Sequence, residues 1–483
     1  MEVPDDARRL LTVMSADIHV EDALMHLYAF IAETPNASFG WLHFGSDAVH
    51  GVHRGAQVHL WRSTLRRCIG ERSKVRGLTG IAGLGGALSR IAASGYVSDE
   101  DSRSLVTALL VLDDSFDGVH VGEVLADYDE EGFVELRSRL RNGRPLFAMG
   151  SYSALPRPRR AIPFVPRGQG IVAELLRNLA IVKEKPPLTV RNSIMFHGSD
   201  RPVRGFDRIG IIPTINEHAE LEWIKDGPQR YRVDECLAAK QVVRDRVRAG
   251  LNLLCDAGVD LILMPELVSS TALTELVGLE LRTRSDIGKA TPYLVLAGTS
   301  FVLSDGRTRN RATLFNGRGD VVWVQDKMHA YTFTVREQAE SGHPLGQADL
   351  ADRCEAMDPE PRTLHLVDLS ATQRVAVLTC EDFIQPEPHQ SVVAEAATTL
   401  ILVPIMSGRR ESSAVGWIHD GALNYARRPG ATSVIANSGT LLNGPGEGWQ
   451  YGHVVAEPRV SADWQQLPPD GKAVAWLTQV AKA

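Results

Sequence analysis

From Phe206 onward, short apolar segments alternate with amphipathic helices, and this alternation limits the possible folds more than any other pattern in the chain. VDLILMPEL, RVAVLTCEDF and TTLILVPIM contain apolar runs of strand length, whereas DECLAAKQVVRDRVRAGLNLLCDAG repeats its apolar residues at helical spacing and ends at Gly258. The sequence NGRGD is typical of a turn in a hairpin between two further strands. This pattern predicts an α/β fold in which helices cover a sheet.

The first 155 residues have a different pattern. Apolar residues recur there at mostly helical spacing, as in ARRLLTVM, VEDALMHLYAFIAE and DSRSLVTALLVLDD. The stretch GIAGLGGAL lacks the G-x-G-x-x-G spacing of a phosphate-binding loop, so we predict a flexible turn before a helix. Residues 1–155 are therefore expected to form an α-rich N-terminal domain of unknown role.

Residues 156–205 are basic and rich in proline. They contain ten Lys and Arg residues against three Asp and Glu residues, and the stretch PRPRRAIPFVPRGQG holds four prolines. Such a composition predicts a linker that lies on an acidic surface. Few aromatic residues alternate with the basic ones, which argues against binding of single-stranded nucleic acid. We assign residues 206–483, including a C-terminal tail, to the third unit.

Composition excludes several classes of protein. A net charge of -7 over 483 residues argues against a protein whose main partner is nucleic acid. Five widely spaced cysteines without a C-x-x-C pair fit a reducing compartment and argue against a disulfide scaffold or a structural zinc site. The N-terminus has no basic segment followed by an apolar one, and no stretch is apolar enough to span a bilayer. We therefore expect a cytoplasmic protein that binds no membrane.

Three reactive side chains follow predicted strands. Glu266 comes after DLILMP, Lys327 after VVWVQD, and Cys380 after RVAVLT. A carboxylate beside an apolar strand end can act as a general base, an ammonium can stabilise an oxyanion, and a thiolate can attack a carbonyl carbon. Taken singly, each has a plain structural explanation: a cap, a surface lysine and a core cysteine.

The three residues together resemble the Glu-Lys-Cys set of the nitrilase (carbon–nitrogen hydrolase) superfamily. They occur in the family's order and at its spacing, within a strand ending in P-E, a K-x-H sequence, and a strand followed by C-E-D. The hairpin RNRATLFNGRGDVVWVQDKMH and the stretch from Trp417 to ATSVIANSGT are also similar to the family. The resemblance covers roughly residues 206–458.

The resemblance implies a role for each residue. Cys380 would attack a carbonyl or nitrile carbon and form a thioester. Glu266 would take the thiol proton and pass it to the leaving amine. Lys327 would hold the oxyanion with help from the backbone N–H of Glu381. No metal or organic cofactor is implied.

The family also uses a second glutamate after the lysine, which orients the substrate and the attacking water. Glu337 and Glu340 are the candidates, and the spacing favours Glu337. Glu381 and Trp417 are the expected substrate-binding residues. The acidic stretch from His343 to Leu364 would form a lid or an interface, and His389 is expected on a surface turn.

The resemblance further implies a nitrilase-type αββα sandwich, here with an α-rich N-terminal extension, that pairs into a homodimer or a higher oligomer. The expected activity is cysteine-dependent hydrolysis of a non-peptide C–N bond, with a small-molecule amide as substrate. A glutaminase subunit, an N-acyltransferase and a catalytically quiet sensing or scaffold module remain alternatives. Residues 1–205 would then offer a surface for a protein partner. C-E-D is closer to the glutaminase domains of glutamine-dependent NAD synthetases, yet the S-G-G-x-D-S loop of a synthetase domain is absent from the sequence.

Overall fold

The structure is a computed structural model of the whole chain. It describes residues 3–37, 74–75, 78–114, 147–149, 152–156, 176, 179–183, 187–194, 206–215, 220–227, 229–233, 240–340, 351–370, 373–385, 389–407, 420–425, 431–438, 452–456, 459–461, 465–467 and 475–479.

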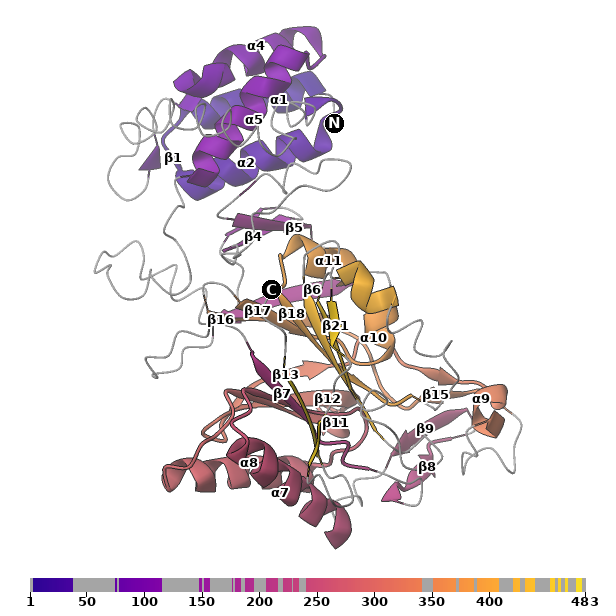
Figure 1. Cartoon of the computed structure of the whole chain (residues 1–483). Coiled ribbons are helices and arrows are strands. Elements are labelled where there is room, and N and C mark those ends of the chain that lie inside the picture. Colours follow the sequence, from indigo (N-terminus) through magenta and orange to yellow (C-terminus); the bar gives the residue numbers. More distant parts are fainter. Residues whose placement is uncertain are drawn as a thin grey trace.

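The C-terminal half is built on two seven-stranded sheets (Figure 1). The first runs β13 (Val321–Asp326), β12 (Arg307–Asn316), β11 (Leu294–Ser304), β10 (Leu261–Met264), β7 (Arg208–Ile211), β23 (Ala475–Gln479), β22 (Gln465–Leu467). The second runs β21 (Arg459–Ser461), β20 (Gly452–Ala456), β19 (Thr432–Asn437), β18 (Leu400–Ile405), β17 (Gln373–Val377), β16 (Arg362–Ser370), β6 (Leu188–Ile194). The central strands β7, β10 and β11 are parallel, as are β17, β18 and β19.

One buried apolar cluster joins the two sheets. It includes Leu263 of β10 and Leu296 of β11 from the first sheet, together with Val377 of β17 and Leu402 of β18 from the second. Strand β10 contacts β18 and β19 directly. All four residues of β10 are buried, which explains why this strand reads as a continuous apolar run and does not alternate.

Helices lie against the other face of each sheet. α7 (Gln241–Asp256) and α8 (Thr271–Asp286) contribute Leu251 and Leu276 to a cluster with the first sheet. α10 (Glu381–Ile384) and α11 (His389–Glu395) contribute Phe383 and Val392 to a cluster with the second. The predicted mixed α/β architecture is confirmed.

The second sheet begins ahead of Phe206. Strand β6 lies within the stretch that the sequence assigned to the linker, and it pairs in parallel with β16 over seven residues. Its buried Asn192 donates to the Asp368 carboxylate at 3.0 Å, and Asp368 also binds Arg374 at 2.7 Å. In the strand LTVRNSI, buried and exposed residues alternate, and the even-numbered residues from Leu188 to Asn192 are buried. The basic composition of residues 156–205 led to a linker prediction that missed this pattern.

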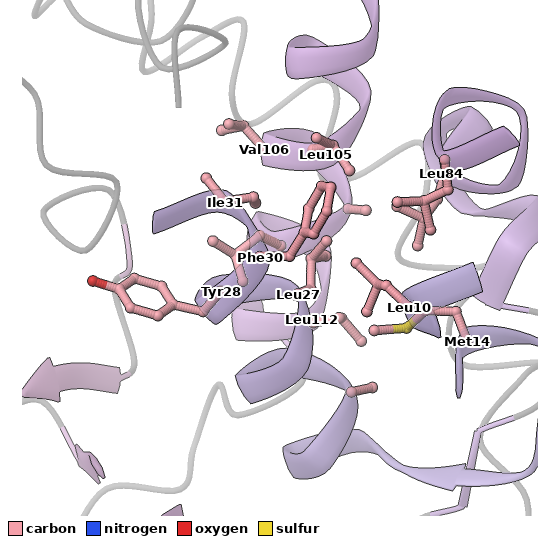
Figure 2. Packing of buried hydrophobic residues seen from close by; sticks show 14 of the residues in the cluster. Leu10, Met14, Leu27, Tyr28, Phe30, Ile31, Leu84, Leu105, Val106 and Leu112 are labelled. Carbon is pink, nitrogen blue, oxygen red and sulfur yellow. The ribbon is translucent and has the colours of Figure 1, made fainter. Parts of the chain in front are cut away.

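Four helices form a separate apolar core in the N-terminal region (Figure 2). They are α1 (Val3–Ser15), α2 (Val20–Glu33), α4 (Leu84–Ser94) and α5 (Asp99–Asp114). Leu10, Leu27, Leu84 and Leu105 each contribute a buried side chain. Residues 80–83 of the glycine-rich stretch lie in the short 3₁₀ turn η3 (Leu78–Gly83), where Gly83 has a φ of 72°. Residues 84–88 already belong to α4, so the helix begins earlier than predicted. The strand pair β1 (Ile18–His19) and β2 (Lys74–Val75) is antiparallel.

A small sheet lies between this helical core and the C-terminal half. β3 (Phe147–Met149), β4 (Tyr152–Pro156) and β5 (Leu179–Lys183) form an antiparallel sheet in which β3 and β4 contact α2, whereas β5 contacts α11 (Figure 1). Leu176 belongs to the helical core and Val182 to the core beneath α11. A short stretch of chain is thus anchored in two cores. Within the described ranges, no helix is long and apolar enough to cross a membrane.

A four-stranded sheet lies beside the first large sheet, where β9 (Arg230–Val233) contacts β11. Its order is β14 (Thr332–Phe333), β15 (Arg353–Glu355), β9, β8 (Trp223–Lys225). The remaining short helix, α9 (Val335–Glu340), follows β14.

Candidate active site

Glu266 follows the carboxyl end of β10, and the sheet geometry holds it there. Its backbone N–H donates to the carbonyl of Ile405 at the end of β18, at 3.3 Å. Leu267 has a φ of 53° and donates its N–H to the Thr299 hydroxyl. These contacts turn the chain away from the strand and leave the carboxylate side chain buried, with 3% of its surface exposed.

Cys380 follows β17 on a strained turn. Its φ is 45° and its ψ is −101°, which is a sparsely populated region for any residue with a side chain. The Cys380 N–H donates to the carbonyl of Pro404 at 3.0 Å. Pro404 and Ile405 are adjacent at the end of β18. Their carbonyls therefore accept the backbone N–H groups of both Cys380 and Glu266, which fixes the two turns close to each other. The turn places the thiol beside the Glu266 carboxylate, where burial and the charge of that carboxylate raise the pKa of the thiol.

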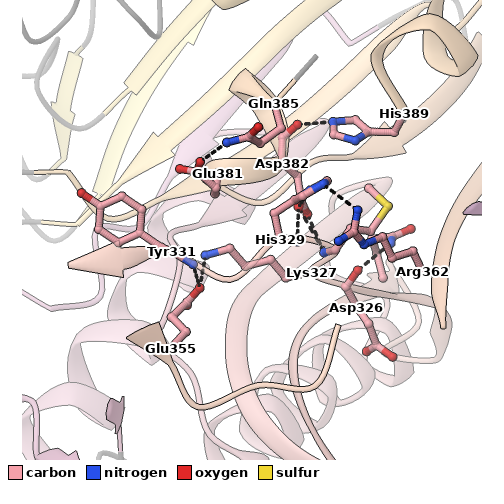
Figure 3. Close-up of polar contacts among 12 residues, drawn as sticks. Asp326, Lys327, His329, Tyr331, Glu355, Arg362, Glu381, Asp382, Gln385 and His389 are labelled. Atoms are coloured by element: carbon pink, nitrogen blue, oxygen red, sulfur yellow. Dashed lines mark hydrogen bonds and ion pairs between the residues drawn. The ribbon is translucent and has the colours of Figure 1, made fainter. Parts of the chain in front are cut away.

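Lys327 follows β13 and lies between two carboxylates. Its ammonium contacts Glu266 Oε1 at 2.7 Å. It also contacts Glu355 Oε2 at 2.6 Å (Figure 3). The backbone N–H of Lys327 donates to the Asn310 carbonyl on β12 at 2.8 Å. All of these side chains are buried, so little water screens their charges. The structure brings Glu266, Lys327 and Cys380 together.

Two further polar residues complete this cluster, and the sequence did not single them out. The Asn310 amide donates to Glu266 Oε1 at 3.2 Å and to Glu355 Oε1 at 3.1 Å. Glu355 also accepts the backbone N–H of Tyr331 at 2.7 Å. Glu355 lies on a three-residue strand inside the acidic stretch that was expected to form a lid or interface. A strand that short has no periodicity from which its orientation can be read.

Burial and neighbouring charges shift the pKa values of all three groups in the cluster. Burial and the neighbouring Glu355 raise the pKa of the Glu266 carboxyl to about 7, although Lys327 opposes them. Burial and Glu266 also raise the pKa of the Cys380 thiol well above its usual range, against the effect of Lys327. Burial lowers the pKa of Lys327, but Glu266 and Glu355 outweigh it and keep the ammonium charged. The resting cluster therefore holds a neutral thiol beside a carboxylate that titrates near neutrality.

Glu337 lies in the first turn of α9. Its carboxylate accepts the N–H and the hydroxyl of Thr334 at 3.0 and 2.8 Å, and the hydroxyl of Tyr331 at 2.7 Å. It therefore connects to the cluster through Tyr331. Glu355 is the second glutamate that contacts Lys327.

The other predicted site residues are placed as follows. Glu381 directly follows the nucleophile candidate, at the start of α10, and its carboxylate accepts from Gln385. Trp417 lies outside the described residues.

A second polar cluster lies behind the first. The buried Asp382 carboxylate accepts the N–H groups of Met328 and His329 and contacts His329 Nδ1 at 3.0 Å (Figure 3). His389 is buried at the start of α11, and its Nε2 donates to the Asp382 carbonyl. The expectation of a surface turn for His389 was wrong, because α11 packs this residue onto the second sheet.

The donor groups of the described ranges form no cluster of three or more His, Cys, Asp and Glu side chains arranged to hold a metal ion. What the first cluster offers is a thiol, a carboxylate and an ammonium. These groups can supply a nucleophile, a proton acceptor and an oxyanion partner.

Comparison with known proteins gives matches among solved structures. No family model and no curated protein matches the chain. An amidase from Nesterenkonia sp. is 18% identical, with a TM-score of 0.33, over 59% of this chain and 94% of the amidase. A double mutant of that amidase in complex with acrylamide is also 18% identical, with a TM-score of 0.34, over 58% of this chain and 92% of the mutant. A single mutant of the same enzyme is described as a member of the nitrilase superfamily.

Proposed function

We propose that this protein is a cysteine-dependent hydrolase of non-peptide C–N bonds, built on a nitrilase-type αββα sandwich, and that it cleaves small-molecule amides through a thioester. The observation that carries the proposal is the buried contact of one ammonium with two carboxylates beside a strained cysteine. Burying three charged groups costs several kcal/mol per ion before pairing offsets it. Apolar residues would fill this buried position without that cost. A role in catalysis explains why charged residues are found there instead.

In the first half-reaction, the Cys380 thiol passes its proton to Glu266 as its sulfur attacks the amide carbonyl carbon. The carbonyl π electrons move onto oxygen and form a tetrahedral oxyanion. The intermediate then collapses, the C–N bond breaks, and the protonated Glu266 gives its proton to the departing nitrogen. The products of this half are an amine or ammonia and a thioester on Cys380.

In the second half-reaction, a water molecule attacks the thioester carbon. Glu266 takes one proton from the water, and the second tetrahedral intermediate expels the thiolate. The proton returns to sulfur, which restores the resting thiol and releases a carboxylic acid. Glu355 adjoins the same ammonium as Glu266, so it is placed to orient the water or the substrate.

Lys327 would donate a hydrogen bond to the oxyanion in this reaction. An ammonium has three N–H groups, and those of Lys327 that contact Glu266 and Glu355 account for two. The third is available for the substrate oxygen. In a buried site, a preorganised donor of this kind contributes on the order of 10²–10³ in kcat.

The test is ammonia release from a panel of amides, ureas and nitriles, with the wild type compared with Cys380→Ala. We expect release by the wild type and a loss of several orders of magnitude in the variant. Cys255→Ala is the matched control, because Cys255 is a buried thiol of α7 far along the chain from this cluster. Equal activity of Cys380→Ala and wild type would contradict the thioester route.

Added amines separate hydrolysis from acyl transfer. If the thioester is intercepted by an amine, turnover will depend on that amine and an N-substituted amide will accumulate. Silence of the wild type on every substrate, with Cys380 resistant to iodoacetamide, would favour a sensing or scaffold role.

A further inference from the structure

Asp382 joins the two turns that carry the thiol and the ammonium. It lies two residues after Cys380, and it is completely buried. Its carboxylate accepts the N–H of Met328 at 3.1 Å and the N–H of His329 at 2.8 Å. Those are the two residues that directly follow Lys327. The Asp382 carboxylate therefore links the turn after Cys380 to the main chain of the turn after Lys327.

Hydrogen bonds from backbone N–H groups also fix the chain before and after Met328 and His329. The Lys327 N–H donates to the Asn310 carbonyl, and the chain after His329 is fixed again where the Tyr331 N–H donates to Glu355. Between these two points, Asp382 supplies the charged acceptor. Hydrogen bonds to an ionised acceptor are roughly twice as strong as neutral ones.

The surrounding histidines orient Asp382. His329 contacts Asp382 through Nδ1 and Arg362 through Nε2, at 3.0 and 3.2 Å. With Nδ1 donating to the carboxylate, Nε2 accepts from the guanidinium, and both ring nitrogens are engaged. His389 holds the Asp382 main chain through its carbonyl, and the His329 and His389 rings lie 5.2 Å apart. Figure 3 shows these side chains gathered around Asp382.

We propose that Asp382 is a positioning residue that holds the main chain after Lys327 against the Cys380 turn and so sets the ammonium beside the thiol. This role rests on the proposed function of Cys380 as the nucleophile. Asp382 itself touches neither the substrate nor the thiol, and it acts through Lys327.

The consequence concerns the ease with which Cys380 loses its proton. A nearby ammonium stabilises the thiolate, and the thiolate is the species that reacts with alkylating agents. If Asp382 no longer anchors residues 328 and 329, the ammonium moves and the thiolate loses that support. The ionisable groups that face the thiol come from four elements or their flanking turns: Glu266, Lys327, Tyr331, Glu355 and Tyr231.

The experiment measures alkylation of Cys380 by iodoacetamide in the full chain across pH 6 to 10, by peptide mass spectrometry. Asp382→Ala should slow labelling about tenfold or more at each pH in this range, because below the thiol pKa the thiolate fraction falls tenfold for each unit by which that pKa rises. Asp382→Asn should lie between this variant and the wild type, because an amide oxygen still accepts N–H groups without the charge. Should Asp382→Ala fail to fold, Asp382→Asn carries the test.

Asp368→Asn is the matched control. Asp368 is also a buried carboxylate, but it binds Arg374 at the opposite end of β17 from Cys380. This control should leave the labelling rate of Cys380 unchanged even if it lowers thermal stability. Cys255, buried in α7, reports general loosening of the fold within the same samples.

The outcomes separate the two proposals. A reactive wild-type Cys380 whose labelling rate is unchanged at every pH in both Asp382 variants would overturn the positioning role and leave the proposed function standing. Faster labelling of Cys380 together with Cys255 would also overturn it, since that pattern indicates a merely structural contribution. A wild-type Cys380 that resists alkylation at every pH would overturn both.

Discussion

At the scale of single residues, the site is defined by a shortage of positive charge. Two buried carboxylates, Glu266 and Glu355, share one ammonium. Burial and the neighbouring Glu355 raise the pKa of the Glu266 carboxyl, and the single ammonium of Lys327 only partly opposes them. The imbalance gives Glu266 a titration near neutral pH, which is what a base that alternates between accepting and donating a proton requires.

The first prediction concerns pH. Because the pKa of Glu266 is raised to about 7, the carboxyl is protonated below that pH and cannot accept the thiol proton. We expect kcat/KM to fall about tenfold for each unit of pH below about 7 and to level off above it. Glu266→Gln should remove this limb and lower kcat by about 10²–10⁴. A limb centred near 4.5, the ordinary value for glutamate, would contradict the argument.

The second prediction concerns Asn310, whose amide donates to both carboxylates. Asn310→Asp would place a third carboxylate in the cluster, and like charges raise the pKa of one another. We expect the acidic limb of kcat/KM to move upward by about one unit or more. Asn310→Ala removes the donor without adding charge, so its limb should move less. Identical pH profiles for the two variants would count against an electrostatic role for Asn310.

At the scale of elements, the site depends on how strands end. β11 carries an irregularity between Leu296 and Thr299 where its pairing with β12 shifts. At this place Gly298 has a φ of 73°, and a Cβ there would lie 2.6 Å from the carbonyl oxygen of Pro265. The bulge lets Thr299 contact the turn that carries Glu266, through the Pro265 carbonyl and the Leu267 N–H.

The third prediction tests this bulge. Gly298→Ala combines a left-handed backbone with a collision against main-chain atoms, so it should lower the free energy of unfolding by about 2–4 kcal/mol. Gly306→Ala is the matched control, because Gly306 has a φ of 71° in the β11–β12 turn but a Cβ there would meet no heavy atom within 4 Å. That variant should cost only about 1 kcal/mol. Urea unfolding measures the free energy of unfolding of both variants. Equal decreases in the two variants would show that the close approach of residue 298 to Pro265 does not affect stability.

At the scale of the whole molecule, a short segment connects two apolar cores. Leu176 is buried among the N-terminal helices, whereas Val182 on β5 is buried with α11 of the C-terminal half. β3 and β4 of the same small sheet contact α2. The N-terminal region is therefore bound to the helix that begins at His389, next to the polar cluster around Asp382.

The fourth prediction asks whether these cores unfold independently. Leu176→Ala should destabilise the helical core by about 2–5 kcal/mol and lower hydrogen-exchange protection in α2 and α5. Val182→Ala should cost roughly 2 kcal/mol and lower protection in α11 and β17. Loss of protection across both regions in either variant would show one cooperative unit and contradict independent unfolding.

Local patterns of residues were enough to identify the main elements and three of the site residues. Continuous apolar runs indicated the buried central strands, and a reactive residue directly after each of three runs indicated Glu266, Lys327 and Cys380. Local order suffices for such residues, because a strand end has a definite direction and the next side chain leaves the sheet there.

Long-range packing, by contrast, selected the groups that complete the cluster. Glu355 lies on a strand of three residues, Asn310 lies in the middle of a long hairpin, and Asp382 acts across 54 residues of chain. Their roles depend on the packing of the two sheets and on the close approach of β18 to the turns after β10 and β17. Those are distances between segments far apart in the chain, and no local pattern of residues carries them. The same reason explains why β6 was hidden in a basic linker and why the buried place of His389 could not be read from its proline-rich surroundings.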